Sequence, residues 1–162
     1  MKRIYFDRAF SALLLLGWMS LIFMFSAQTG DTSGNTSGSI VDVIINMFYP
    51  KFNTLSPAKQ LDIIEFWQII VRKTAHFTEY AILGVLCANA LRTFKINTIV
   101  FWTASVSICV LYAISDEIHQ YFVPDRACRI LDVCIDTAGA VSGIAFFVVF
   151  VFLIKKIKEK RK

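Results

Sequence analysis

Four apolar stretches constrain the fold of this chain more than any other feature of its sequence. They cover about residues 9–27, 75–92, 96–115 and 133–154, and the first and third carry no charged residue. A helix needs roughly 20 residues to cross the hydrocarbon core of a bilayer. Backbone polar groups in lipid must be satisfied within the chain, so each stretch is predicted to be helical. The sequence therefore predicts an all-α integral membrane protein, a bundle of four transmembrane helices.

Composition agrees with this class. The chain has 162 residues, of which 56% are hydrophobic, and its mean hydropathy is +0.59. This length fits a single domain covering residues 1–162. The first stretch is interpreted as a membrane anchor and not as a cleaved signal peptide, because its apolar run is long and "SAQTG" is a poor cleavage site.

The position of the charges explains the net charge of +5. Lys and Arg concentrate near both termini and in the connection between the second and third stretches. The positive-inside rule then predicts a multi-pass protein of the plasma membrane with both termini in the cytoplasm. The basic C-terminal segment would lie beside anionic headgroups, so membrane lipids are the expected partners and nucleic acid is not. Oligomeric state is left open.

A long outer loop, residues 28–71, separates the first two predicted spans. Its first part, "QTGDTSGNTSGS", is predicted to be a flexible loop. A short amphipathic helix is predicted next from apolar residues at helical spacing: Ile40, Val43, Ile44, Met47 and Phe48. Ser56 and Pro57 then predict a helix start, with the helix running on into the second span. These pieces would either cover a site between the spans or lie on the membrane surface, and the second alternative is favoured.

On this topology four separate segments bring polar side chains to the outer end of the bundle. They are Gln28 after the first span; Arg72, Lys73, His76, Glu79 and Tyr80 at the start of the second; Asp116, Glu117, His119 and Gln120 at the end of the third; and Arg126, Asp132 and Asp136 around the start of the fourth. A carboxylate buried in a membrane costs several kcal/mol unless it is paired or hydrated. Arg72, Lys73 and Arg126 are the expected partners of the two aspartates of the fourth span.

Helical spacing places several of these side chains on common faces. The sets spaced three or four residues apart are Arg72, His76 and Glu79; Asp116, His119 and Gln120; and Asp132 and Asp136. Gly139 and Gly143 continue the last stripe, and small residues allow helices to approach closely.

Simpler explanations compete for single residues. Lys73 is expected chiefly to reach lipid headgroups, and Asp132 can favour the positive end of a helix. A bridge between Cys128 and Cys134 is left open, because spacing alone cannot show one. For the whole cluster, a functional site is favoured over a structural ion-pair network, because ionisable groups within a membrane are functional candidates by default.

Three motifs and one short element carry a family resemblance. "RKTAHFTEYAILG", "SDEIHQYFVPDR" and "DVCIDTAGAVSG" follow one another in order, and "FSAQTG" precedes them. Together, over about Phe25 to Gly143, they resemble the VanZ-like family. Two departures stand out: Asp125 occupies a position where the family usually has Gly, which would change the turn before Arg126, and Ala27 stands where Ser is common.

The resemblance implies a bacterial cell-envelope protein. The family is named for a glycopeptide-resistance accessory protein associated with reduced susceptibility to teicoplanin. The residues of this chain that match the family's motifs are Arg72, Lys73, His76, Glu79, Tyr80, Asp116, Glu117, His119, Gln120, Arg126, Asp132 and Asp136.

Two functions from different classes remain. The first, slightly favoured, is a membrane-embedded enzyme acting on a lipid or lipid-linked cell-wall component; the second is a protein that binds a lipid, a glycopeptide or a partner without chemistry. Acid–base candidates are His76, Glu79, Asp116, Glu117, His119 and Asp136. Substrate-binding candidates are Gln28, Arg72, Lys73, Tyr80, Gln120, Arg126 and Asp132. No cofactor is predicted, although His76, His119 and the carboxylates leave a divalent metal as an open alternative.

Overall fold

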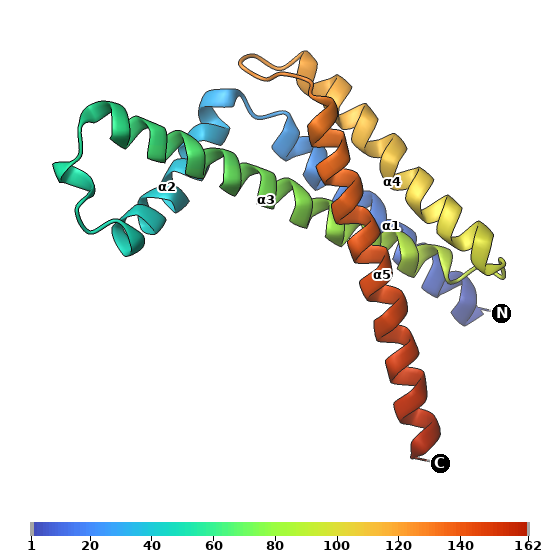
Figure 1. Ribbon diagram of the computed structural model, residues 1–162. Helices are drawn as coiled ribbons and strands as arrows, with labels where there is room; N and C mark the ends of the chain where they lie inside the picture. Colours follow the sequence, from blue (N-terminus) through green and yellow to red (C-terminus); the bar gives the residue numbers. More distant parts are fainter. Residues whose placement is uncertain (1, 162) are drawn as a thin grey trace.

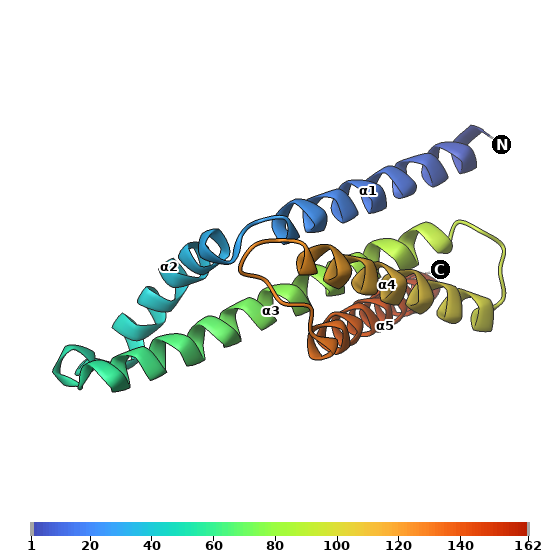
Figure 2. The same cartoon turned by 90° about the horizontal axis from the view of Figure 1, so that it is seen from above.

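The computed structural model (Figures 1 and 2) describes residues 2–161, and their side chains except those of 2, 3, 31–33, 35 and 36. The described residues form helices throughout: α1 (Lys2–Ser26), α2 (Gly30–Phe48), the short 3-10 helix η1 (Phe52–Thr54), α3 (Pro57–Leu91), α4 (Thr98–Tyr121) and α5 (Ile130–Lys160). No strand occurs among them. The all-α class predicted from the apolar stretches is therefore confirmed.

Three helices are long and apolar enough to cross a membrane: residues Ile4–Ser26, Thr98–Tyr121 and Ile130–Lys160. They correspond to the first, third and fourth predicted spans. The second predicted span, 75–92, forms the C-terminal part of α3, whose charged residues lower its hydropathy. The predicted count of four spans therefore stays a prediction at this point.

Contacts at the two ends of the bundle show that α1 and α4 run in the same direction. At one end, the Ser26 hydroxyl of α1 donates to Asp116 of α4. At the other end, Arg8 of α1 donates to the carbonyl oxygen of Thr93, just before α4 begins. The chain returns between these ends through α3, and Trp18 of α1 donates to the Glu79 carbonyl oxygen along the way. α5 then runs back across α3 (Figure 1).

Glycines allow the crossing of α3 and α5 to be very close. A Cβ atom at Gly139 or Gly143 of α5 would collide with a carbonyl oxygen of α3, that of Phe77 or Ala81. A Cβ atom at Gly84 of α3 would collide with the main chain of α5 in the same way. The predicted stripe of small residues on the last span is thus confirmed as a helix-packing surface.

The prediction of a flexible loop after α1 is wrong, because α2 begins at Gly30, inside the Gly- and Ser-rich segment. Weak helix formers are helical here because α2 packs against the rest of the molecule, and packing outweighs intrinsic propensity. Val41 and Ile45 are buried, whereas Val43 and Met47 of the predicted apolar stripe are exposed. The apolar stripe of α2 therefore faces outward.

The helix start at Ser56 and Pro57 is confirmed, and α3 continues without interruption into the predicted second span. Its first half pairs with α2 to form an arm that extends beyond the bundle (Figures 1 and 2). The far end of this arm is held by polar contacts: Trp67 donates to the Tyr49 hydroxyl at 3.2 Å, and Gln60 donates to two carbonyl oxygens around η1.

The buried core lies where α1, α3, α4 and α5 meet. Its central members are Ile22, Tyr80, Leu83, Cys87, Cys109, Ala113 and Ala140. Many large apolar side chains outside this core are exposed, among them Leu13, Ile99 and Phe146. An exposed apolar surface of this extent is what a protein surrounded by lipid presents.

Candidate functional site

Two adjoining cavities lie where α1 passes into α2. The first, called the amphipathic cavity below, has a volume of about 250 Å³ and is lined by Phe25, Ser26, Gln28, Ser37, Ile40, Val71, Arg72, Ala75, His76, Glu79 and Arg126. The second, called the polar cavity, has about 190 Å³ and is lined by Arg72, His76, Gln120, Asp125, Arg126, Ala127, Arg129 and Asp132. Arg72, His76 and Arg126 form part of both walls.

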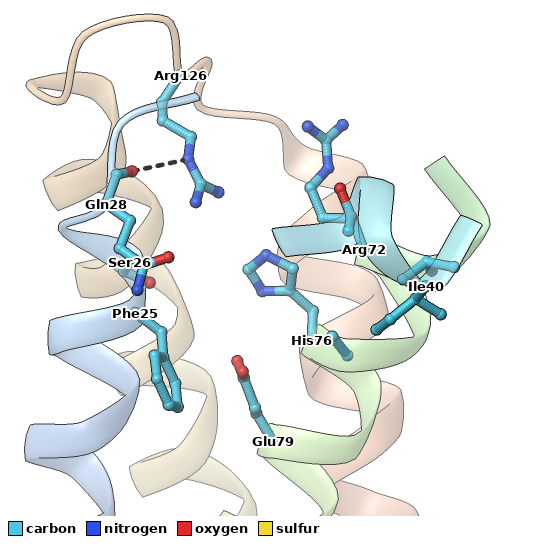
Figure 3. Close-up of a pocket in the computed structure, with 11 residues that line it drawn as sticks. Phe25, Ser26, Gln28, Ile40, Arg72, His76, Glu79 and Arg126 are labelled. Atoms are coloured by element: carbon cyan, nitrogen blue, oxygen red, sulfur yellow. Dashed lines mark hydrogen bonds between the residues drawn. The ribbon is translucent and has the colours of Figure 1, made fainter. Parts of the chain in front are cut away.

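The face of α3 predicted from spacing lines the amphipathic cavity. Arg72, His76 and Glu79 follow one another down α3, and Figure 3 shows their side chains directed toward the same space. Arg126 enters from the connection between α4 and α5, and its Nε–H donates to the Gln28 carbonyl oxygen at 3.3 Å (Figure 3). Segments far apart in the sequence thus converge here, as predicted.

The two guanidinium groups of the site belong to Arg72 and Arg126. Within the described part of the chain, neither Arg72 nor Arg126 forms an ion pair. Burial and the nearby charge of Arg72 lower the pKa of the Arg126 guanidinium, although arginine remains protonated in proteins. Two neighbouring cations that repel each other in a partly buried cavity favour the arrival of an anion.

A layer of buried acids lies next to the cavities without lining either of them. It consists of Asp116, Glu117 and Asp136, each at most 2% exposed. Asp116 accepts hydrogen bonds from Ser26 at 2.8 Å and from Gln120 at 3.1 Å. The Ser26 bond joins the end of α1 to α4, whereas the Gln120 bond lies within α4.

Each acid of this layer keeps unmet hydrogen-bonding capacity. Glu117 accepts the backbone N–H of Arg129 at 2.8 Å, but its Oε1 has no partner among the described residues. Within the same part of the chain, Asp116 Oδ1 and both carboxylate oxygens of Asp136 also have none. Because a buried polar atom without a partner is costly, such atoms require an explanation.

His76 connects the buried acids to the cavities. Its Nδ1 lies 3.7 Å from Asp136 Oδ1, which is too long for a hydrogen bond but close enough for charge attraction. The imidazole also lines both cavities. A histidine between a carboxylate and a cavity can accept or release a proton at the cavity.

Lys73 is not free to reach headgroups as its simplest interpretation requires. Its Nζ donates to Asp132 Oδ1 at 2.9 Å, and both side chains are partly exposed. This pair joins α3 to α5 at the rim of the site. Of the three cations expected to pair with these aspartates, Lys73 is the one that does so with Asp132.

Not all candidate residues converge on the cavities. The His119 ring stacks on Phe23, with ring centroids 4.3 Å apart, and lines neither cavity. Tyr80 is fully buried in the core. Gln28 lines the amphipathic cavity, whereas Gln120 lines the polar one. The candidate acid–base set therefore presents only His76 and Glu79 to the cavities.

Several cavity residues were not among the candidates. They are Phe25, Ser26, Ser37, Ile40, Val71 and Ala75 in the amphipathic cavity. Ser26 belongs to the short element that precedes the three motifs, so a signal for it was present in the sequence. Ile40 was predicted to belong to an amphipathic helix, and its position shows that α2 forms part of the cavity wall. No sequence signal identifies Val71 or Ala75.

The turn before Arg126 keeps the backbone conformation that glycine favours. Asp125 has a φ of 59°, in the left-handed region, where aspartate is tolerated better than most residues. Gly30 at the start of α2 donates its N–H to the Pro124 carbonyl oxygen, and a Cβ there would collide with Asp125. The departure at Asp125 therefore leaves the turn that places Arg126 intact.

The residues considered for a metal do not form a ligand set within residues 2–161. The structure places no group of three or more His, Cys, Asp or Glu side chains there that could hold a metal ion. Cys128 and Cys134 are free and exposed, so the bridge left open between them is not formed.

Comparison with known proteins agrees with the motif resemblance. The sequence profile of the VanZ/LLP1 family matches residues 10–152, which is most of the chain. Neither a curated protein nor a solved structure gives a significant match. The long apolar helices and this match over nearly the whole bundle place the chain in the VanZ/LLP1 family of membrane proteins.

Proposed function

We propose that this protein is a membrane-embedded enzyme that acts on a lipid or lipid-linked cell-wall component at the outer face of the bacterial plasma membrane. One observation carries the proposal: His76 and Glu79 share one cavity with Arg72 and Arg126. Acid–base groups and unpaired cations around one small space suit proton transfer on a bound anionic group.

The residues divide into binding and proton-transfer roles. Arg72 and Arg126 bind the anionic headgroup, because guanidinium groups match the geometry of phosphate oxygens. Glu79 accepts the proton of a water or hydroxyl as its oxygen forms a bond to the phosphorus of the headgroup, and His76 donates a proton to the oxygen of the P–O bond that breaks. Asp136, whose Oδ1 lies 3.7 Å from His76 Nδ1, is a positioning residue for the imidazole.

The helix directions support a fourth membrane pass. α1 and α4 run in the same direction, as the contacts Ser26–Asp116 and Arg8–Thr93 indicate. If both cross the bilayer, the chain between them must cross back, and α3 is the helix that runs between the two ends. Its charged residues then face the interior site, where the cost of burying them is lowest. Together with the positive-inside rule, this arrangement supports an orientation with both termini in the cytoplasm and the cavities at the outer face.

A non-enzymatic lipid-binding protein is the second candidate. The observation that favours it is the burial of the acid layer: Asp116, Glu117 and Asp136 do not reach the cavities. Two arginines are sufficient for headgroup binding, and the buried acids would then only balance their charge. Lower susceptibility to teicoplanin-type glycopeptides, implied by the family resemblance, is compatible with either candidate if the lipid affects the target of these antibiotics.

A direct search for lipid conversion distinguishes the two candidates. The purified protein is incubated with vesicles of bacterial envelope lipids, and the products are quantified by mass spectrometry. Wild type is expected to convert a lipid, and Glu79→Gln to lose about 100-fold or more of the rate. Asp62→Asn, an exposed acid on the same helix, is the matched control and should retain full activity. If wild type converts no lipid but retains one, the enzyme proposal fails and the binding function replaces it.

A further inference from the structure

The amphipathic cavity has two chemically different ends. Arg72, His76, Glu79 and Arg126 form its polar end (Figure 3). Phe25, Ile40, Val71 and Ala75 form its apolar part. A soluble anion would need only the polar end. A cavity that combines both suits an amphiphile.

The apolar part continues onto the outer surface of the helices. Phe25 of α1 is 46% exposed and Ile40 of α2 is 50% exposed, so both line the cavity and also face outward. Their exposed neighbours on the same helices, Met24 and Val43, are apolar as well. An apolar path therefore leads from the charged groups to the surface of the protein between α1 and α2.

Cavity size limits the group that reaches the charged end. Pockets for drug-sized ligands have volumes of about 300–1,000 Å³. At about 250 Å³, the amphipathic cavity is smaller than this range. A glycopeptide or a large saccharide does not fit inside it, whereas a single phosphate group does. The size and the paired arginines thus point to one compact anionic headgroup.

We infer that the site takes a lipid with a single compact phosphate headgroup, which enters sideways from the membrane. The phosphate lies between Arg72 and Arg126, and the acyl chain leaves past Phe25 and Ile40 between α1 and α2. This inference rests on the proposed headgroup site and adds the class of ligand and its route of entry. The polar cavity, on the other side of His76, serves as the water-facing side of the same site.

Binding of two probes with the same phosphate group tests the route. Full-length purified protein in detergent micelles is titrated with dioleoyl phosphatidate or with water-soluble glycerol 3-phosphate, and bound ligand is counted by native mass spectrometry. Wild type should bind the phosphatidate much more tightly than glycerol 3-phosphate, because only the first fills the apolar part. Equal affinity for the two probes would overturn the acyl-chain route.

Two pairs of variants place the route between α1 and α2. Ile40→Trp should block the exit and weaken phosphatidate binding about tenfold or more, with no change for glycerol 3-phosphate. Met47→Trp, on the same helix but lining neither the amphipathic nor the polar cavity, is its control. Phe25→Gln places an amide in the path and should weaken phosphatidate binding similarly, whereas Leu13→Gln, at an exposed apolar position of the same helix that lines neither cavity of the site, should not.

Arg72→Gln separates failure of the route from failure of the headgroup site. If Arg72→Gln loses phosphatidate while Ile40→Trp and Phe25→Gln bind like wild type, the headgroup site stands and the route is wrong. If Arg72→Gln binds like wild type, or wild type binds no phosphatidate, both the proposed headgroup site and the route are overturned.

Discussion

The two ends of the helix bundle differ in how completely their polar side chains are paired. At the end near the N-terminus, Arg8 donates to the Thr93 carbonyl oxygen and stacks over Phe94, and Asn89 donates to the Ser11 hydroxyl. At the other end, Arg72 has no ion-pair or hydrogen-bond partner, and three buried acids keep oxygens without partners, as far as residues 2–161 are described. Polar side chains at the first end have local hydrogen-bond partners, whereas several at the other end have none among the described residues.

Cavity volume alone would place the site at the opposite end of the bundle, beside Arg8. The cavity between α1 and the end of α3 with the connection that follows it, lined by Arg8 and Asn89, has about 550 Å³, more than twice the volume of the amphipathic cavity. Its charged residues are those that the positive-inside rule expects at a cytoplasmic surface. The site is therefore distinguished by buried polar atoms that lack hydrogen-bond partners among the described residues, and not by the volume of its cavities.

The largest loss of stability is expected from disrupting the close crossing of α3 and α5. Gly143→Leu would drive a side chain into the Ala81 carbonyl region of α3, so the crossing of α3 and α5 could not form. Destabilisation should exceed about 3 kcal/mol, and little folded protein should be recovered on size-exclusion chromatography. Gly17→Leu is the control, since nothing lies within 4 Å of a Cβ at Gly17. Normal recovery of Gly143→Leu would mean that the crossing is looser than described.

Replacing one arginine at each end by glutamine tests whether the two ends differ in ligand binding and in stability. Arg72→Gln should weaken phosphatidate binding by about 10- to 100-fold, because a charge-assisted hydrogen bond contributes about 1.5–3 kcal/mol. Its thermal stability should not fall, because no described residue pairs with it. Arg8→Gln should do the reverse and lower the melting temperature while binding stays unchanged. Similar behaviour of the two variants would remove the distinction between the ends.

Substitution of two serines should give a smaller difference in the free energy of unfolding, measured by chemical or thermal unfolding. Ser26→Ala removes the donor to Asp116 and leaves a buried carboxylate with one bond fewer, at a cost of about 1–3 kcal/mol. Ser11→Ala removes only an acceptor of Asn89 at the opposite end, in a part-buried bond, and should cost less than about 1 kcal/mol. An equal cost at the two ends would indicate that Asp116 does not depend on Ser26.

The sequence predicted what depends on local pattern. Apolar length identified α1, α4 and α5, the Ser56–Pro57 pair identified the start of α3, and four-residue spacing placed Arg72 with His76. Each of these features is encoded within a few turns of one helix, so no knowledge of packing is needed.

Features that depend on packing could not be predicted in this way. The Gly- and Ser-rich start of α2 is helical because other elements cover it, and propensity alone favours a loop. Spacing grouped His119 with Asp116, but only the approach of α1 places Phe23 on its ring. Likewise, residue spacing cannot show that Glu117 is buried and accepts the Arg129 N–H. Nor can it show that Glu79 faces a cavity.

Asp136→Asn tests whether the fully buried carboxyl group behind His76 serves function or the stability of the fold. Asp136 is fully buried without a hydrogen-bond partner in the described chain, so an asparagine amide of the same shape breaks no existing hydrogen bond. We predict an equal or higher melting temperature, with lipid turnover per folded molecule reduced about tenfold or more as His76 loses its neighbouring carboxyl group. A lower melting temperature with unchanged turnover would contradict the account and identify the acids as a structural ion-pair network.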